Sequence, residues 1–255
     1  MNTRHAQPGH RLDQALVSRG LCPSREQAKR LILAGRVRVN GHPANKASDP
    51  AAADDEIVLL ESEKYVSRGG HKLEHALQHF DLRITGGVAI DLGASTGGFT
   101  DCLLQHGAQR VYAVDVGRGQ LAWVLRRNPQ VVVMEKTNAR HLAPEHFPRG
   151  FAPVDWVTID CSFISLRLLL PPAVALLRKG GSIVALIKPQ FEAGKAEVDK
   201  GEGVITDAAV HRRILSEMES FVGTVRGLRW RGVTESPLVG PAGNKEFLCL
   251  IEKNA

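Results

Sequence analysis

The sequence predicts an α/β protein in which a small N-terminal α+β domain precedes a larger domain built on a seven-stranded sheet. Apolar runs typical of strands alternate with helical segments from about residue 88 onward. A glycine-rich turn follows the first of these runs, as in Rossmann-like folds that bind nucleosides. Positive charge is concentrated in the first 48 residues, which indicates a separate unit there.

Composition limits the class of protein. A chain of 255 residues with 43% hydrophobic and 5% aromatic residues is long enough for one aliphatic α/β domain and a small appendage. The longest apolar stretch, 168–177, is too short to span a bilayer, and residues 1–8 lack the apolar core of a signal peptide. We therefore expect no membrane insertion. The scattered cysteines indicate no metal site, no disulfide framework and a cytoplasmic location; they are Cys22, Cys102, Cys161 and Cys249.

The N-terminal segment has a legible pattern of helices and strands. An apolar face over residues 12–16 predicts a first helix, and Ser24 and Gln27 form a capping box that begins a second. Residues 37–39 alternate apolar and polar side chains and lead into an Asn-Gly hairpin turn at 40–41. Residues 1–48 carry nine Lys and Arg against two acids, whereas residues 49–64 carry six acids against one lysine.

This arrangement resembles the small RNA-binding domain shared by a small-subunit ribosomal protein, tyrosyl-tRNA synthetases and pseudouridine synthases. The likeness covers residues 11 to about 60, and its most specific string is AKRLILAGRVRVNG at 28–41. The resemblance implies that cations on the helices and first strand meet RNA phosphates. The alternative is a solvated basic face without a partner. The residues expected to contact RNA are Arg11, Arg25, Lys29, Arg30, Arg36 and Arg38.

The boundaries follow from the change in pattern. We expect an RNA-binding domain over 1–63, a hinge linker over 64–70 because of its double glycine, and a Rossmann-like domain over 71–255. Helices are expected near 72–80 and 206–222. Strands are expected near 88–92, 111–115, 131–134, 154–159, 182–188, 229–236 and 246–252.

The most informative motif is DLGASTGGFTD at 91–101, which reads as a strand end, a glycine-rich turn and the start of a helix. Its G-x-x-x-G-G spacing differs from the G-x-G-x-x-G of dinucleotide enzymes. It resembles the first motif of S-adenosylmethionine-dependent methyltransferases; the alternative is an ordinary strand-to-helix turn. Asp115 ends the second strand, where an acid can accept hydrogen bonds from a ribose diol. Asn138 is a candidate to contact the edge of the adenine base. It can equally well be interpreted as an exposed polar residue of a loop. The expected cofactor-binding residues are Asp91, Gly93, Ser95, Thr96, Gly97, Gly98, Phe99, Asp115, Asn138 and Asp160.

Four ionisable residues, far apart in the chain, stand near the ends of predicted elements. Asp160 follows the fourth strand, Lys188 ends the fifth, Glu246 begins the last, and Lys72 begins a helix. A lysine that emerges from an apolar strand suggests function, although it can also reach water by snorkelling. These positions match the Lys-Asp-Lys-Glu tetrad of FtsJ-like RNA ribose 2′-O-methyltransferases.

Over residues 11–252 the chain resembles the TlyA family of rRNA cytidine 2′-O-methyltransferases, also called haemolysin-like. The most specific strings of this resemblance are SRGGHK at 67–72, DLGASTGGFT at 91–100, DCSFIS at 160–165 and IKPQFE at 187–192. It implies S-adenosylmethionine as cofactor and ribosomal RNA or ribosomal subunits as partner.

Methyl transfer to a 2′-hydroxyl is an in-line displacement, which requires alignment and removal of the hydroxyl proton. Lys188 is the candidate base and must be neutral to act. Burial and the like charge of Lys72 favour the neutral amine, whereas Asp160 opposes this while orienting it. Glu246 is expected to hold Lys72 and the substrate ribose. Cys161 stands next to this site, but we interpret it as a packing residue because it lacks the Pro-Cys or Thr-Cys setting of cytosine C5 methyltransferases.

Further contacts with RNA are expected from Arg68 and from a polar, glycine-rich segment at 194–203, interpreted as a mobile loop that carries Lys195 and Lys200. A surface loop without a ligand is the alternative. Two other functions remain open at this point: a membrane-lytic haemolysin, and a non-catalytic RNA-binding assembly factor that keeps a cofactor fold.

Overall fold

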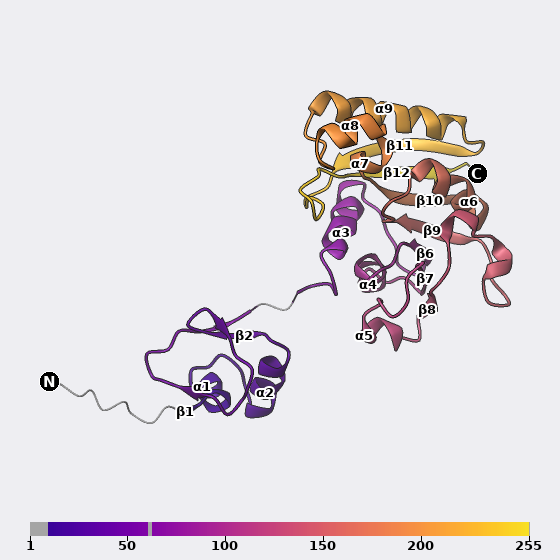
Figure 1. Cartoon of the computed structure of the whole chain (residues 1–255). Coiled ribbons are helices and arrows are strands. Elements are labelled where there is room, and N and C mark those ends of the chain that lie inside the picture. The colour runs from indigo at the N-terminus through magenta and orange to yellow at the C-terminus, as the bar shows by residue number, and fades with distance from the viewer. Residues whose placement is uncertain (1–9, 61–62, 255) are drawn as a thin grey trace. The chain divides into compact units, whose positions relative to one another are not determined.

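The computed structural model describes residues 10–60 and 63–254, and the chain divides into two compact units, Met1–Glu63 and Lys64–Ala255 (Figure 1). The first unit pairs two helices with short strands. Its sheets have the orders β3-β2-β5 and β1-β4, all antiparallel. Its elements are β1 (His10–Arg11), α1 (Leu12–Ser18), α2 (Arg25–Leu33), β2 (Val37–Val39), β3 (His42–Pro43), β4 (Pro50–Ala51) and β5 (Ile57–Leu59).

Local sequence explains this unit. The Ser24 side chain accepts a hydrogen bond from the Gln27 backbone N–H at 3.3 Å and so caps α2. Asn40 and Gly41 both have positive φ, 51° and 78°, as a two-residue type I′ turn between β2 and β3 requires. The predicted hairpin and cap are thus confirmed. Buried apolar side chains from α1, α2 and β2 form the core, including Leu12, Leu16, Ala28, Ile32 and Val37.

The second unit is organised around a seven-stranded sheet of order β11-β12-β10-β9-β6-β7-β8. Neighbouring strands from β10 to β8 run parallel, and β12 is antiparallel to both β10 and β11. Figure 1 shows β11 and β12 at one end of this sheet and β8 at the other. The strands are β6 (Val88–Leu92), β7 (Arg110–Val114), β8 (Val131–Met134), β9 (Val154–Ile159), β10 (Leu177–Ile187), β11 (Leu228–Glu235) and β12 (Phe247–Lys253).

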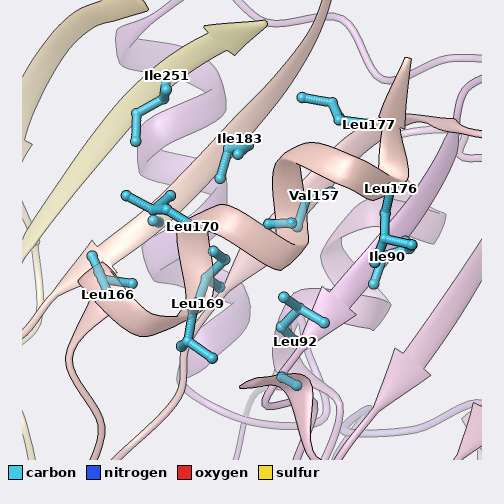
Figure 2. Packing of buried hydrophobic residues seen from close by; sticks show 14 of the residues in the cluster. Ile90, Leu92, Val157, Leu166, Leu169, Leu170, Leu176, Leu177, Ile183 and Ile251 are labelled. Carbon is cyan, nitrogen blue, oxygen red and sulfur yellow. The ribbon is translucent and has the colours of Figure 1, made fainter. Parts of the chain in front are cut away.

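Helices cover both faces of the sheet. Figure 2 shows leucines of α6 packed over strand residues such as Ile90, Val157 and Ile183. On the other face, Leu73 of α3 and Leu103 of α4 share a core with Val184. None of the helices within the described ranges is long and apolar enough to cross a membrane. The helices are α3 (Gly69–His79), α4 (Gly98–Gln105), α5 (Trp123–Arg126), η1 (Ala139–His141), η2 (Pro144–His146), α6 (Leu166–Leu176), α7 (Pro189–Glu192), α8 (Lys195–Lys200) and α9 (Ala208–Thr224).

The expected hinge at 64–70 differs from the structure, because most of it packs into the second unit. Tyr65 is 2% exposed and belongs to the core of that unit. The Val66 N–H donates to the Asp101 carboxylate at 2.9 Å. A Cβ on Gly70 would lie 2.2 Å from Tyr65 Cγ, so this glycine permits close packing. Helix α3 therefore begins at Gly69, earlier than expected.

Two other expectations need correction. Residues 195–200 form α8 and not a loop; Glu197 accepts a hydrogen bond from the Gly194 N–H and pairs with Arg213 of α9 at 2.6 Å. Strand β10 begins at Leu177, before the expected 182, and its register against β9 shifts between Leu177 and Ser182. The other predicted strands lie within two residues of the observed ones.

Candidate active site

The candidate site lies where the order of the parallel strands reverses. Strand β6 is bordered by β7 on one side and by β9, much later in the chain, on the other. In open α/β sheets, the crevice outside the carboxyl ends of strands at such a switch point binds ligands. The loops after β6, β7, β9 and β10 carry most of the residues described below.

The glycine-rich turn after β6 depends on two glycines with positive φ. Gly93 has φ 84°, and a Cβ there would lie 2.7 Å from the Asp160 carbonyl oxygen, so only glycine lets the ends of β6 and β9 meet. Gly97 has φ 100°, and a Cβ there would lie 2.3 Å from the Leu125 side chain. Gly97 allows the turn to pack against the Leu125 side chain, and it lines neither of the two cavities described below.

Asp91 lines neither of the two cavities described below, and its expected part in cofactor binding stays a prediction. It is fully buried, and its two oxygens accept hydrogen bonds from the hydroxyls of Thr100, at 2.7 Å, and Thr158, at 3.0 Å. Burial raises its pKa to about 6 despite these hydrogen bonds. Asp91 therefore ties β6 to α4 and β9 beneath the turn.

A first cavity, of about 460 Å³, opens beside the turn; we call it the cofactor cavity. Asp115 lines it, and its carboxylate accepts hydrogen bonds from the N–H groups of Ser95, at 2.8 Å, and Gly117, at 2.7 Å. These bonds fix an acid at the carboxyl end of β7, as expected. The lining residues are Gly93, Ser95, Val114, Asp115, Val116, Gln120, Thr137, Asn138, Ala139, Asp160, Cys161, Ser162, Phe163, Ile164 and Leu169.

Asn138 and Cys161 also line this cavity, and their surroundings differ. The side-chain oxygen Oδ1 of Asn138 accepts a hydrogen bond from the Arg140 backbone N–H at 3.0 Å and so caps η1. Burial, with the negative charge of Asp160 beside it, raises the pKa of the Cys161 thiol to about 12. Because the thiolate is the nucleophile, this environment disfavours covalent catalysis by Cys161.

A second cavity, of about 390 Å³, adjoins the first and shares Gly93, Ser95, Asp160 and Ser162 with it. All four residues of the predicted tetrad line this tetrad cavity, together with Thr96, Gly98 and Phe99 of the glycine-rich turn. Ser67, Arg68, Gly69, Ala94 and Pro241 complete its wall. Residues predicted from the sequence therefore lie on both sides of the wall that the two cavities share.

The tetrad forms two ion pairs. Lys188 Nζ lies 2.6 Å from Asp160 Oδ1, and Lys72 Nζ lies 2.5 Å from Glu246 Oε2. Lys72 and Lys188 are each 8% exposed and Glu246 is 2% exposed. Neighbouring strands explain the convergence: β9 and β10 end where the antiparallel β12 begins, and α3 supplies Lys72.

Ser162 is a site residue that the sequence analysis missed. Lys188 Nζ donates a hydrogen bond to its hydroxyl at 3.1 Å, so the amine has two acceptors. Ser162 also belongs to the wall between the two cavities. An uncharged serine in a loop gives no sequence signal of this kind, although the string DCSFIS contains it.

The basic residues expected to contact RNA are mostly organised by local contacts. Arg11 and Arg25 each bond to Asp13 at 3.0 Å while their side chains stay about half exposed. Burial alone would raise the pKa of Asp13, yet the hydrogen bonds from these arginines hold it below its ordinary value. Arg68 lines the tetrad cavity. Lys29 and Lys195 are exposed, and the Lys200 side chain lies outside the described residues. Arg30 pairs with Glu26. Arg36 donates a hydrogen bond to the Leu60 carbonyl, and Arg38 donates one to the Gly41 carbonyl.

The lining of the cofactor cavity suits a nucleoside that carries a charged amino acid, because a fixed acid at Asp115, the exposed backbone at Gly93 and apolar side chains lie together there. Within residues 10–60 and 63–254, no group of three or more His, Cys, Asp or Glu side chains is arranged to hold a metal ion. The tetrad cavity offers two amines, two carboxylates and the hydroxyl groups of its serine and threonine residues.

Comparisons with known proteins agree with this reading. Residues 65–253 match the model of the FtsJ-like methyltransferase family, and residues 10–57 match the S4 domain. The chain is 48% identical over 239 residues to YqxC of Bacillus subtilis, a protein named as a candidate rRNA methyltransferase, covering 93% of this chain and 84% of that protein. It is 46% identical over 241 residues to the 16S/23S rRNA (cytidine-2′-O)-methyltransferase TlyA of Mycobacterium tuberculosis, covering 93% and 87%.

A solved structure from Streptococcus thermophilus, named as a candidate hemolysin, superposes with a TM-score of 0.72 at 43% identity and covers 98% of this chain and 90% of that one. Similarity of this extent reaches across both units. The chain therefore belongs to the FtsJ-like methyltransferase family and, with its S4 domain, to the branch that contains the TlyA rRNA methyltransferases.

Proposed function

We propose that this protein transfers the methyl group of S-adenosylmethionine to the ribose 2′-hydroxyl of a cytidine in ribosomal RNA. The observation that carries the proposal is the shared wall of the two cavities. A methyl donor in the cofactor cavity and a ribose in the tetrad cavity would meet at Gly93, Asp160 and Ser162. Such adjacency is the alignment that an in-line displacement requires.

S-adenosylmethionine, when bound, supplies an electrophilic methyl group on a sulfonium. Asp115 would hold its ribose diol, and the turn from Gly93 to Phe99 would pass close to its amino-acid part. The apolar side chains of Val116 and Ile164 would face the base. These roles follow from positions on the cavity walls.

The acceptor hydroxyl needs a general base and a group that stabilises the charge developing on its oxygen. Lys188, once it has lost a proton to solvent, accepts the hydroxyl proton through Nζ, while Asp160 and Ser162 fix the direction of the amine. The ammonium of Lys72, held by Glu246, stabilises negative charge that develops on the ribose oxygen. After transfer, Lys188 carries the proton, and its pairing with Asp160 stabilises that charge.

The S4 domain would make the first contacts with the RNA, and its cations would meet phosphates of a structured region. Arg68 in the tetrad cavity and Lys195 on α8 would contact the backbone near the target nucleotide. A ribosomal substrate supports the cytoplasm as the compartment in which the protein would act.

The test uses the full chain, isotope-labelled S-adenosylmethionine, and small and large ribosomal subunits purified separately from a strain that lacks the modification. Nuclease digestion and nucleoside analysis then locate the label. The proposal predicts 2′-O-methylcytidine in one or both subunits. Label on a base, or no label in either subunit under conditions where cofactor binds, contradicts it.

A further inference from the structure

Much of the net positive charge of the second unit comes from one stretch of sequence, 110–149, part of which lines the cofactor cavity. Residues 110–149 contain seven Lys and Arg against three Asp and Glu, a net charge of +4. The whole unit, residues 64–255, contains 24 against 19, a net charge of only +5. One stretch, which includes β7, α5 and β8, thus accounts for most of the excess.

The same stretch exposes large apolar side chains. Val116, Trp123 and Val124 are 68%, 69% and 66% exposed. The guanidinium of Arg127 lies over the Trp123 ring, 5.9 Å from its centroid. We call these four residues the α5 surface. An exposed indole beside a cation, within a basic region, is the combination that single-stranded nucleic acids bind by stacking and charge.

The α5 surface is joined to the cofactor cavity. Val116 lines that cavity, and the Ala122 N–H, at the start of α5, donates to the Thr96 carbonyl of the glycine-rich turn at 3.0 Å. On the buried side, Leu125 packs where a Cβ on Gly97 would otherwise stand. Figure 1 shows α5 beside β8, at the end of the sheet opposite β11.

We infer that the α5 surface binds an unpaired nucleotide of the substrate RNA, with its base stacked on Trp123 and its phosphate held by Arg127. The inference rests on the proposed function, since it assigns a second RNA contact near the reacting groups. The net charge of the surrounding stretch favours a polyanion over an apolar protein partner. Stacking tolerates any base, so this contact would add affinity and position the strand.

The experiment compares the variants Trp123→Ala, Trp123→Phe and Arg127→Gln in the full chain. Arg229→Gln on β11 is the matched control, because it removes an exposed arginine from the opposite edge of the sheet. The measurements are KM for the ribosomal subunits, kcat, the Kd for S-adenosylmethionine without RNA, and the salt dependence of RNA binding. Quenching of tryptophan fluorescence by a short single-stranded RNA reports stacking directly.

Trp123→Ala should raise KM for RNA about 5- to 150-fold and leave the affinity for cofactor unchanged. Trp123→Phe should have a KM near that of wild type but should lose the RNA-induced quenching of tryptophan fluorescence. Arg127→Gln should lower the slope of log K against log salt by about one unit. A KM for Trp123→Ala equal to that of Arg229→Gln overturns the inference. The inference is also overturned if Trp123→Ala changes the oligomeric state of the protein without RNA, measured as its molar mass in solution. That result would assign the α5 surface to contact with a second copy of the chain. Absence of methylation by the wild type would instead refute the proposed function.

Discussion

The ion pair of Lys72 and Glu246 allows a quantitative test, because stability and activity should respond differently to its loss. Glu246→Gln removes one charge of a pair whose side chains are 10% and 2% exposed. Removing one partner of a buried pair typically costs about 3–5 kcal/mol, because the other charge is left without compensation. For a unit of roughly 150–250 residues, this lowers Tm by about 6–20 °C.

The double variant Lys72→Met with Glu246→Leu is the matched control. It removes both charges and fills the space of the lysine with an apolar chain of similar length. Replacing a buried pair by apolar groups is often neutral or stabilising, so the double variant should unfold within about 1 kcal/mol of wild type. Both variants should lose methylation, since the single variant leaves the Lys72 ammonium without its carboxylate partner and the double variant removes the ammonium itself.

Urea titration followed by circular dichroism gives the unfolding free energies, and the methylation assay gives the activities. The S4 domain should contribute the same transition in every variant. The reasoning is refuted if Glu246→Gln unfolds within 1 kcal/mol of wild type, or if the double variant is as unstable as the single one. In either case the pair would not be the buried, coupled unit described above.

Three further changes probe the residues around the tetrad. Asp115→Asn should weaken S-adenosylmethionine binding about 10- to 150-fold, measured by calorimetry, because a charged acceptor contributes roughly 1.5–3 kcal/mol; an unchanged Kd would remove Asp115 from the cofactor cavity. Cys161→Ser should keep kcat within about twofold, because the raised pKa of about 12 leaves little thiolate; a loss of more than tenfold in a folded variant would restore the nucleophile. Asp91→Asn should change the pH dependence of stability. The pKa of Asp91 is raised from 3.8 to about 6 in the native state, so the native state binds the proton more tightly, and wild type should lose about 2 kcal/mol relative to the variant as pH rises from 4 to 6. A difference between the two proteins that does not vary with pH would contradict that assignment.

Most of the sheet and the tetrad could be predicted from the sequence for a physical reason. Apolar runs mark strands, and parallel strands bring their carboxyl ends to one edge, so residues that follow different strands converge there. Lys188 and Asp160 are neighbours because β10 pairs with β9. The hairpin at Asn40-Gly41 was predictable because few residues accept positive φ at both turn positions.

Other features depend on tertiary contacts that leave no local pattern. The double glycine before α3 suggested a hinge, but Gly70 is required because Tyr65 packs against its Cα. Helix α8 lies within the polar segment 194–203, and the pairing of Glu197 with Arg213 of α9 helps to hold it. The first acid of the cofactor motif, Asp91, turned inward because two threonine hydroxyls beneath the turn satisfy it.

The central claim is that Lys188 removes the proton from a ribose hydroxyl beside the bound methyl donor. The most direct measurement is single-turnover methylation of ribosomal subunits by Lys188→Met, with cofactor binding and folding verified in the same preparation. The account predicts a rate lower by about 10²- to 10⁴-fold with unchanged cofactor affinity. A rate within a few-fold of wild type would contradict it.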